Sequence, residues 1–327
     1  SISIRESRKN ITVFNIFTEF LLSRRRSGEN ISCWVLVNKH AGISSSAVVN
    51  KVRWLFNAKK AGHAGTLDPE ATGLLAVALG EATKTIPYIT DSLKAYSFVI
   101  KFGAETTTDD CEGEITITSK IRPENEEIIT SLKKFIGKIE QVPPQFSAIK
   151  IDGQRAYNLA RANTDFTISS RPIEVERLNF ISRIDKDHAS FEMTCGKGGY
   201  VRSICRDLGR DLGCYGHTHS IHRIWSGLFN LENAHTVEEL TFLKNNNNLD
   251  QAITPLEASL RNIKEVPINA LDLERVKNGN HFSVGESINF LEEMVWVSYN
   301  KKAIALGNCT NGIFYPFKVL VNYPNSK

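Results

Sequence analysis

The sequence predicts an α+β protein in which a larger domain of helices and strands is followed by a small β domain. Three observations lead to this prediction. The 327 residues are more than one domain of about 150 residues needs. Helical and strand periodicities both occur before residue 250, whereas short strands and tight turns dominate after it. We therefore expect domains at residues 32–250 and 251–327, behind a flexible extension at residues 1–31.

The larger domain begins with a strand and a helix. Residues 34–37 are an apolar run that predicts a strand, and this strand leads into a loop at 38–43. A serine at position 44, 45 or 46 can cap the next helix, because its hydroxyl accepts a hydrogen bond from a free backbone N–H group. Apolar residues at helical spacing between Val48 and Phe56 continue this helix.

The middle of the chain continues the mixture. Aromatic and aliphatic residues alternate with polar ones over residues 96–102, which predicts a half-buried strand. The polar residues 105–114 that follow predict a surface loop. The remaining predicted elements of this domain are a helix at 128–136, strands at 175–184 and 189–195, and a helix at 201–212.

The C-terminal domain is expected to hold a short helix and three strands. Its strongest signal is the pair Asn311-Gly312, since both residues tolerate the positive φ of a two-residue hairpin turn. The predicted elements are a helix at 271–277 and strands at 294–299, 303–306 and 313–321.

The composition excludes several classes of protein. Hydrophobic residues make up 41% and charged residues 23% of the chain, as in a globular protein rather than a disordered one or a coiled coil. The net charge of +4 is compatible with nucleic acid but does not by itself indicate it. The six cysteines form no C-x-x-C pair, so we expect reduced thiols and a cytoplasmic location. No apolar run reaches the roughly 18 residues of a membrane helix.

Two features leave an alternative open. The extension at residues 1–31 could be an organellar targeting peptide, but we expect that removing the first thirty residues changes turnover little. His217, His219 and His222 follow Cys214 closely, and such a group can bind metal. No carboxylate or second thiol nearby completes a tetrahedral set, so no metal site is expected.

The most unusual segment is residues 62–73 (GHAGTLDPEATG), in which three glycines surround the single aspartate Asp68. Glycine permits unusual backbone angles, and Pro69 restricts the residue before it to an extended conformation. A rigid loop that presents one carboxylate suits a nucleophile or a base. The structural alternative is an Asx turn before proline, which local chemistry alone favours.

Several further blocks follow in a fixed order. Together with residues 38–44 (NKHAGIS) and 62–73, they closely resemble the TruB family of bacterial tRNA pseudouridine synthases, over about residues 32–229. The tail resembles the small RNA-binding PUA domain of this family more weakly. The further blocks are residues 79–84 (LGEATK), 94–96 (KAY), 141–150 (QVPPQFSAIK), 153–161 and 195–203 (CGKGGYVRS).

The resemblance implies a fold and a set of roles. The implied fold is the pseudouridine synthase fold, a mixed, largely antiparallel sheet with flanking helices, plus a C-terminal β-barrel-like PUA domain. Asp68 matches the catalytic aspartate, Tyr96 the tyrosine that contacts the flipped uracil, and Arg202 the arginine that pairs with the aspartate. The other residues that match the surroundings of the active site and the RNA loop are Lys39, His63 and Tyr200.

Four of these residues also have a purely structural reading. Tyr96 lies on the apolar face of a predicted strand, where most tyrosines only pack. Arg202 could be a surface salt-bridge residue, Lys39 a solvated loop charge and His63 a structural loop residue. Two positions depart from the family pattern, with Phe146 in place of tyrosine and Gly199 in place of threonine.

The implied reaction fits these residue types. A uridine in the T-loop of tRNA becomes pseudouridine when the glycosidic bond breaks, the base turns and carbon 5 bonds to the ribose. No redox step or net group transfer occurs, so no cofactor is expected. The target base must leave its stack to reach the pocket, and Arg202 would keep Asp68 ionised. The candidates for phosphate contacts are Lys59, Lys60, Arg155, Arg161, Lys197, Arg206 and Arg223. The structural alternative, which is favoured for each of them singly, is a charge on a solvated face.

The expected partner is the T-arm stem-loop of tRNA, bound by a monomer that needs no protein partner and no membrane. One rival is a non-catalytic RNA-binding protein that keeps the fold, and retention of Asp68, Tyr96 and Arg202 argues against it. The other rival is the related archaeal and eukaryotic enzyme, which works with guide RNA and partner proteins. The short tail without a lysine-rich terminus favours the stand-alone bacterial type.

Overall fold

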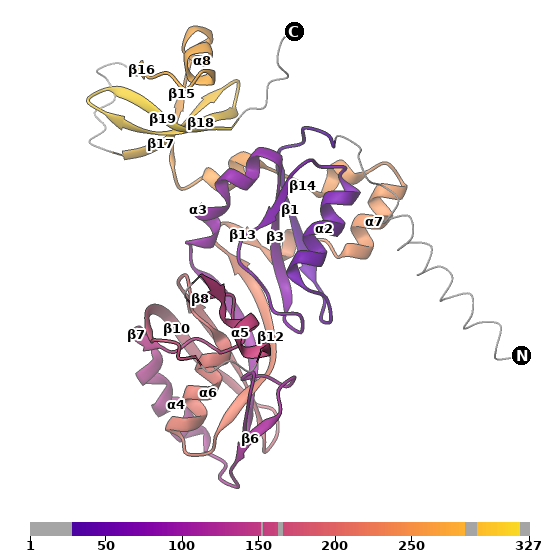
Figure 1. Ribbon diagram of the computed structural model, residues 1–327, viewed down its shortest axis with the longest axis vertical. Coiled ribbons are helices and arrows are strands. Elements are labelled where there is room, and N and C mark those ends of the chain that lie inside the picture. The colour runs from indigo at the N-terminus through magenta and orange to yellow at the C-terminus, as the bar shows by residue number, and fades with distance from the viewer. Residues whose placement is uncertain (1–27, 152, 163–165, 285–292, 321–327) are drawn as a thin grey trace, which may run out of the picture.

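The computed structural model describes residues 28–151, 153–162, 166–284 and 293–320. A ten-stranded sheet with flanking helices forms the large domain, and a separate five-stranded sheet forms the C-terminal domain. Figure 1 shows the C-terminal domain at one end of an elongated molecule, with the large sheet running through the remainder. This architecture confirms the predicted α+β class.

Eight strands cross the large sheet in the order β14–β1–β3–β12–β4–β11–β10–β7, with β2 beside β3 and β13 beside β12. Among these described strands only β12 and β3 pair in parallel, so the sheet is mixed and largely antiparallel, as predicted. The strands are β1 (Cys33–Lys39), β2 (Ala61–His63), β3 (Thr72–Leu79), β4 (Lys94–Phe102), β7 (Gly137–Gln141), β10 (Arg171–Arg183), β11 (His188–Cys195), β12 (Gly216–Ser226), β13 (Phe229–Asn230) and β14 (Ile253–Pro255).

Helices cover the sheet in two groups. Helices α2 and α7 pack on β1 and β3 around Val48, Val52 and Leu240, and helices α4 and α6 pack on β4, β10 and β11 around Phe98 and Phe191. The helices are α2 (Ser45–Leu55), α3 (Ile86–Thr90), α4 (Asn125–Leu132), α5 (Ala156–Arg161), α6 (Val201–Asp211) and α7 (Val237–Asn245), with short 3₁₀ helices η1 (Gly80–Thr85), η2 (Lys133–Phe135), η3 (Leu231–Asn233), η4 (Leu249–Ala252) and η5 (Leu256–Leu260).

The local signals explain several of these elements. Ser44 caps α2, since its hydroxyl accepts a hydrogen bond from the N–H of Ala47 at 3.2 Å, as predicted for this serine cluster. The apolar residues of the predicted alternation in β4 are buried, Tyr96, Phe98 and Ile100 among them. The strands predicted at 175–184 and 189–195 pair as antiparallel neighbours, β10 and β11.

The prediction of a surface loop at residues 105–114 is wrong in part. Residues Ala104–Thr106 form β5, which pairs with β6 (Ile115–Thr118), and the side chains of Glu105 and Asp109 are buried. The reason is that arginines of α6 neutralise both carboxylates: Arg210 bonds Glu105, and Arg206 lies 3.0 Å from Asp109. Acidic residues are found buried where such partners are present.

The C-terminal domain is a sheet in the order β15–β17–β18–β19–β16, with α8 (Ala270–Lys277) beside it. The predicted hairpin at Asn311-Gly312 is confirmed, because both residues have positive φ, 52° and 72°, between β18 and β19. The strands are β15 (Lys264–Pro267), β16 (Phe282–Ser283), β17 (Glu293–Tyr299), β18 (Lys302–Thr310) and β19 (Ile313–Val319).

The chain passes from the large sheet to the C-terminal sheet near residue 260. Residues 253–255, which we assigned to the C-terminal domain, form β14 and pair with β1 in the large sheet. The change of sheet therefore falls between Pro255 and Lys264, later than the predicted boundary at 250. Contacts join the domains, since Lys84 Nζ donates to the carbonyl of Val319 at 2.6 Å and the N–H of Ala303 donates to Glu257 at 2.9 Å.

The predicted extension lies mostly outside the described residues. Its last part contacts the large domain, because the N–H of Glu29 donates to the carbonyl of Asn57 at 2.7 Å. In the part of the chain that the structure describes, no helix combines the length and apolar character needed to cross a membrane.

Candidate active site

Asp68 lies in the loop between β2 and β3, and its neighbours fix this loop from several sides. The hydroxyl of Ser45, at the start of α2, donates to the carbonyl of Leu67 at 2.7 Å and accepts from the N–H of Leu67 at 2.9 Å. The carbonyl of Pro69 accepts from the N–H of Gly42 at 3.0 Å. Hydrogen bonds hold the residues on both sides of Asp68, so the backbone that carries its carboxylate has a defined position.

Lys39 belongs to this support. Its side chain is fully buried, and Nζ donates to the carbonyls of His40, Ile43 and Pro69 at 2.7–3.0 Å. Burial lowers the pKa of Lys39 to about 8. All three ammonium hydrogens have acceptors in the protein. Lys39 therefore lies beneath the loop and holds it, and is not exposed at a surface that could face RNA.

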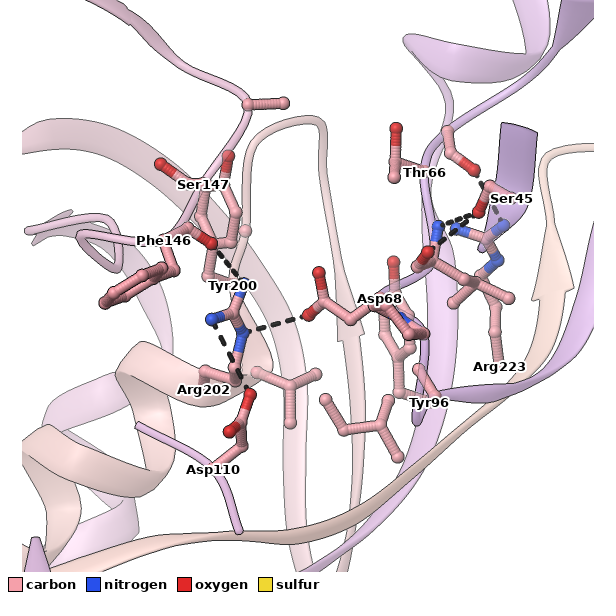
Figure 2. A pocket seen from close by; sticks show the side chains of 18 of the residues that line it. Ser45, Thr66, Asp68, Tyr96, Asp110, Phe146, Ser147, Tyr200, Arg202 and Arg223 are labelled. Carbon is pink, nitrogen blue, oxygen red and sulfur yellow. Dashed lines mark hydrogen bonds and ion pairs between the residues drawn. The ribbon is translucent and has the colours of Figure 1, made fainter. Parts of the chain in front are cut away.

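Arg202 faces Asp68 from the first turn of α6. Its Nε lies 2.9 Å from Asp68 Oδ2, and only 5% of its side chain is exposed, against 39% for Asp68. The two terminal nitrogens of Arg202 donate to the carbonyls of Thr108 and Phe146, each at 2.9 Å. Figure 2 shows the Asp68 carboxylate pointing toward this guanidinium. Arg202 is therefore fixed before substrate arrives and orients the carboxylate.

A second carboxylate completes the group. Asp110 Oδ2 lies 3.8 Å from Arg202 Nη1, while its other oxygen accepts hydrogen bonds from the Thr108 hydroxyl at 2.5 Å and the N–H of Glu112 at 3.0 Å. Burial raises the pKa of Asp68 above that of an ordinary aspartate, and the charge of Asp110 adds to the rise while Arg202 opposes it. Asp68 is thus a carboxylate poised to take a proton or to attack.

Tyr96 stands on the other side of Asp68 (Figure 2). It lies on β4, opposite Arg223 of β12 in the strand register, and its side chain is buried. Burial raises the pKa of the phenol, which Arg223 partly offsets. Tyr96 both packs in the core of the domain and forms part of the pocket wall.

Tyr200 occupies the N-cap position of α6, two residues before Arg202. Its backbone N–H donates to the Gln141 side chain at 2.8 Å, and the amide of Gln141 donates to its carbonyl at 3.1 Å. Burial raises the pKa of its phenol. These two hydrogen bonds to Gln141 of β7 fix the start of α6 and with it the position of Arg202.

These side chains surround one cavity of about 720 Å³. Four of the six predicted site residues line it: Asp68, Tyr96, Tyr200 and Arg202. Lys39 lies beneath the loop, and His63 is a half-buried residue of β2 outside the lining of the cavity. The structure therefore brings together a carboxylate, a guanidinium and two phenols that come from segments up to 134 residues apart (68 to 202).

Sequence reasoning missed Asp110, which it placed in a surface loop. It also misread two arginines as phosphate contacts: Arg206 and Arg223 are buried and bond protein groups instead. Two of the other candidates, Lys197 and Arg161, are exposed and do line the cavity. The missed signal for Asp110 was its position beside Asp109 in a run of acids with no cation nearby in the sequence.

The alternative of a histidine metal site is not supported. Buried His217 bonds the carbonyl of Ala104 through Nδ1 at 2.8 Å, whereas Nδ1 of His222 lies 2.8 Å from the Thr72 hydroxyl. Within the described ranges, no group of three or more histidine, cysteine or acidic residues is placed to hold a metal ion.

The two departures from the family pattern leave the geometry intact. Phe146 holds Arg202 through its backbone carbonyl, so this contact does not depend on a hydroxyl. A Cβ atom at Gly199 would lie 2.7 Å from Cys195 Sγ, so glycine is the residue that fits beside this cysteine.

Comparison with known proteins gives a consistent result. Residues 53–201 match the model of the TruB family pseudouridylate synthase N-terminal domain, and residues 202–261 match that of the tRNA pseudouridylate synthase B C-terminal domain. The chain is 53% identical over 298 residues to a tRNA pseudouridine synthase B of Dinoroseobacter shibae, covering 91% of this chain and 98% of that one. A protein of the same name from Bartonella tribocorum is 43% identical over 313 residues, which cover 90% of this chain and 98% of that one.

A solved structure shares the fold. The chain is similar to a protein in an H/ACA ribonucleoprotein bound to a substrate RNA containing 2′-deoxyuridine, with a TM-score of 0.67 and 22% sequence identity. The match covers 89% of this chain and 87% of the other. At this identity the likeness supports the predicted pseudouridine synthase fold alone.

Proposed function

The chain belongs to the TruB family of pseudouridylate synthases, and we propose that it isomerises the T-loop uridine of tRNA to pseudouridine with Asp68 as the catalytic carboxylate. The observation that carries the assignment of Asp68 is its ion pair of 2.9 Å with Arg202 at a cavity that Tyr96 also lines. This enzyme is an isomerase, so its substrate and product have the same atoms.

We assign a task to each group. The partly exposed carboxylate of Asp68 acts on the ribose of the bound nucleotide, as a nucleophile or by taking a proton, and Arg202 holds it in the ionised form for this step. The ring of Tyr96 offers a face on which the detached uracil can turn and be retained. Tyr200 closes the opposite wall. The base changes its attachment point within the cavity.

Access for RNA comes from the open side of the cavity. A uridine inside a folded loop must leave its stack to enter, and single-stranded loops are where bases can be splayed out. The exposed cations Lys197 and Arg161 line the cavity, and Lys59 and Lys60 are exposed just before β2. We assign phosphate contacts to these four residues, and we assign to the C-terminal domain a further contact with the tRNA.

The test of Asp68 is the variant Asp68→Asn on a T-arm stem-loop whose uridines carry tritium at carbon 5. Asparagine has nearly the same shape but neither attacks nor accepts a proton, so tritium release should fall below detection while RNA affinity is kept. The matched control is Asp187→Asn, which removes a carboxylate outside the cavity and should keep full activity. Unchanged release by Asp68→Asn would refute the assignment.

We further propose that the protein acts alone, as a cytoplasmic monomer. The support is that the cavity is complete within one chain, with every residue assigned above contributed by the large domain. Purified protein should convert a bare T-arm stem-loop without any added RNA or protein, and light scattering should give the mass of one chain. A requirement for a guide RNA or a second protein would refute this proposal, and cell fractionation tests the location.

A further inference from the structure

The two sides of the cavity differ in how their positive charges are balanced. On one side, Arg202 faces the carboxylates of Asp68 and Asp110. On the other side lie Arg223 and Lys94, which also line the cavity and are almost fully buried. In the described part of the chain, no carboxylate oxygen lies within 4.0 Å of a charged nitrogen of either residue.

Neutral carbonyl groups hold both cations. Arg223 is 1% exposed, and its Nε and Nη2 donate to the carbonyls of Leu74 and Gly65 at 2.8 and 2.9 Å. Lys94 Nζ donates to the carbonyls of Thr90 and Ser92 at 2.6 and 2.9 Å. Carbonyls satisfy the hydrogen atoms but bring no full negative charge to offset either cation.

Arg223 and Lys94 lie next to each other and next to Tyr96. A Cβ atom on Gly65 would lie 3.3 Å from Arg223 Nη1 and 3.4 Å from Lys94 Cε, so both side chains flank the same glycine. Arg223 and Tyr96 are direct neighbours in the antiparallel pair of β12 and β4, and both side chains reach the cavity. Figure 2 shows Arg223 on the far side of Tyr96 from Arg202.

Burying an uncompensated cation is costly, so a protein that does so at a reaction site gains something from the charge there. The reaction supplies a matching negative charge. When the bond between ribose C1′ and N1 breaks, its electron pair stays with the base, and the detached uracil is an anion until C5 bonds to C1′ and its hydrogen leaves as a proton. This holds whether Asp68 attacks the ribose or takes a ribose proton.

Resting on the proposed function, we propose that Arg223, with Lys94 beside it, is a positioning residue that stabilises the detached uracil anion across Tyr96. A fixed cation aimed at a charge that exists only after bond breaking accelerates that step without tightening substrate binding. A contact with an RNA phosphate does not explain Arg223, because its guanidinium is too deeply buried to reach the backbone.

The experiment compares two stem-loops, one with uridine and one with 5-fluorouridine at the target position. Fluorine withdraws electrons and stabilises the base anion by itself, so the cation matters less. We measure loss of the target nucleotide in single turnover at saturating enzyme, by mass spectrometry of RNA digests. The variants are Arg223→Gln, which is neutral, and Arg223→Lys, which keeps the charge.

Arg223→Gln should slow the uridine reaction about 100-fold and the 5-fluorouridine reaction about tenfold, with unchanged RNA affinity. Arg223→Lys should slow both reactions by the same smaller factor. The control is Arg206→Gln, which removes a buried arginine outside the cavity. Any structural damage it causes should affect both substrates equally.

Equal losses of Arg223→Gln on the two substrates would overturn the inference and leave Arg223 a structural residue. If melting curves show that Arg223→Gln does not stay folded, Lys94→Gln provides the same test, with a smaller difference between substrates expected and equal losses again decisive against it. Failure of the proposed function is a separate result, because wild-type protein would then leave both stem-loops unchanged.

Discussion

Removing the positive charge beside Asp68 should move the pH dependence of catalysis in a direction that the structure fixes. Burial raises the pKa of Asp68, and Arg202 at 2.9 Å opposes the rise. An opposite charge at such a distance lowers a carboxylate pKa by about 1–3. Because Asp68 is 39% exposed, solvent screens part of this effect, and we expect Arg202→Gln to raise the pKa of Asp68 further above its ordinary value.

The sign of the activity change follows. In the proposed mechanism Asp68 acts in its ionised form, so activity is lost as the pH falls through its pKa, and a higher pKa moves the acid limb of kcat/KM to higher pH. Above that limb, misplacement of the freed carboxylate should still cost about 100-fold. Binding should be kept, since Arg202 is 5% exposed and has no free face for RNA.

The assay is tritium release from the stem-loop between pH 5 and 9, with RNA affinity measured by fluorescence anisotropy at each pH. The double variant Arg202→Gln with Asp110→Asn adds a check, because the charge of Asp110 raises the pKa of Asp68. Its acid limb should move back toward that of the wild type. An acid limb that stays in place in the single variant, or a loss of affinity in proportion to the loss of activity, would refute the reasoning.

Three other predictions concern the stability of the loops around the site and the binding of RNA. Lys39→Met removes three buried hydrogen bonds and should lower the free energy of unfolding in urea by about 3 kcal/mol, and an unchanged midpoint would contradict this. Gly73→Ala should cost at least about 2 kcal/mol in a thermal melt, because φ is +96° and the new Cβ would lie 2.3 Å from the Arg223 carbonyl oxygen. Lys59→Ala with Lys60→Ala should weaken RNA binding and reduce the salt slope by about 1–2, whereas an equal slope would place the phosphates elsewhere.

Local signals in the sequence were sufficient to predict the helix, strand and loop that surround the site. The serine at position 44 caps α2, the alternation of β4 puts Tyr96 on the buried face, and the glycines and Pro69 around Asp68 predict a fixed loop. Each of these features depends on neighbours within a few residues, so the sequence contains the information directly. The pairing of Asp68 with Arg202 came only from family resemblance, since no local rule joins residues 134 positions apart.

Asp110 and Arg206, two of the residues that sequence reasoning misplaced, share one physical property: each is paired with a residue of opposite charge that is distant in the sequence. Arginines at i, i+4 and i+8 of α6 have the spacing of a solvated helix face, and the acids after β4 have the composition of a solvated loop. Taken separately, each set predicts exposure. The structure places the two sets against each other in three ion pairs: Arg202 with Asp110, Arg206 with Asp109 and Arg210 with Glu105.

Charge pairing of this kind explains both errors. Arg206 pairs with Asp109 and Asp110 with Arg202, and in each pair the two residues lie far apart in the sequence. Arg223 is a different case, because its partners are backbone carbonyls of β3 and of the loop before Asp68, and no side-chain pattern records a carbonyl. Because carbonyls and not a carboxylate hold Arg223, no acidic residue in the sequence points to its position. For the same reason its positive charge is not offset, and it can stabilise an anion formed during the reaction.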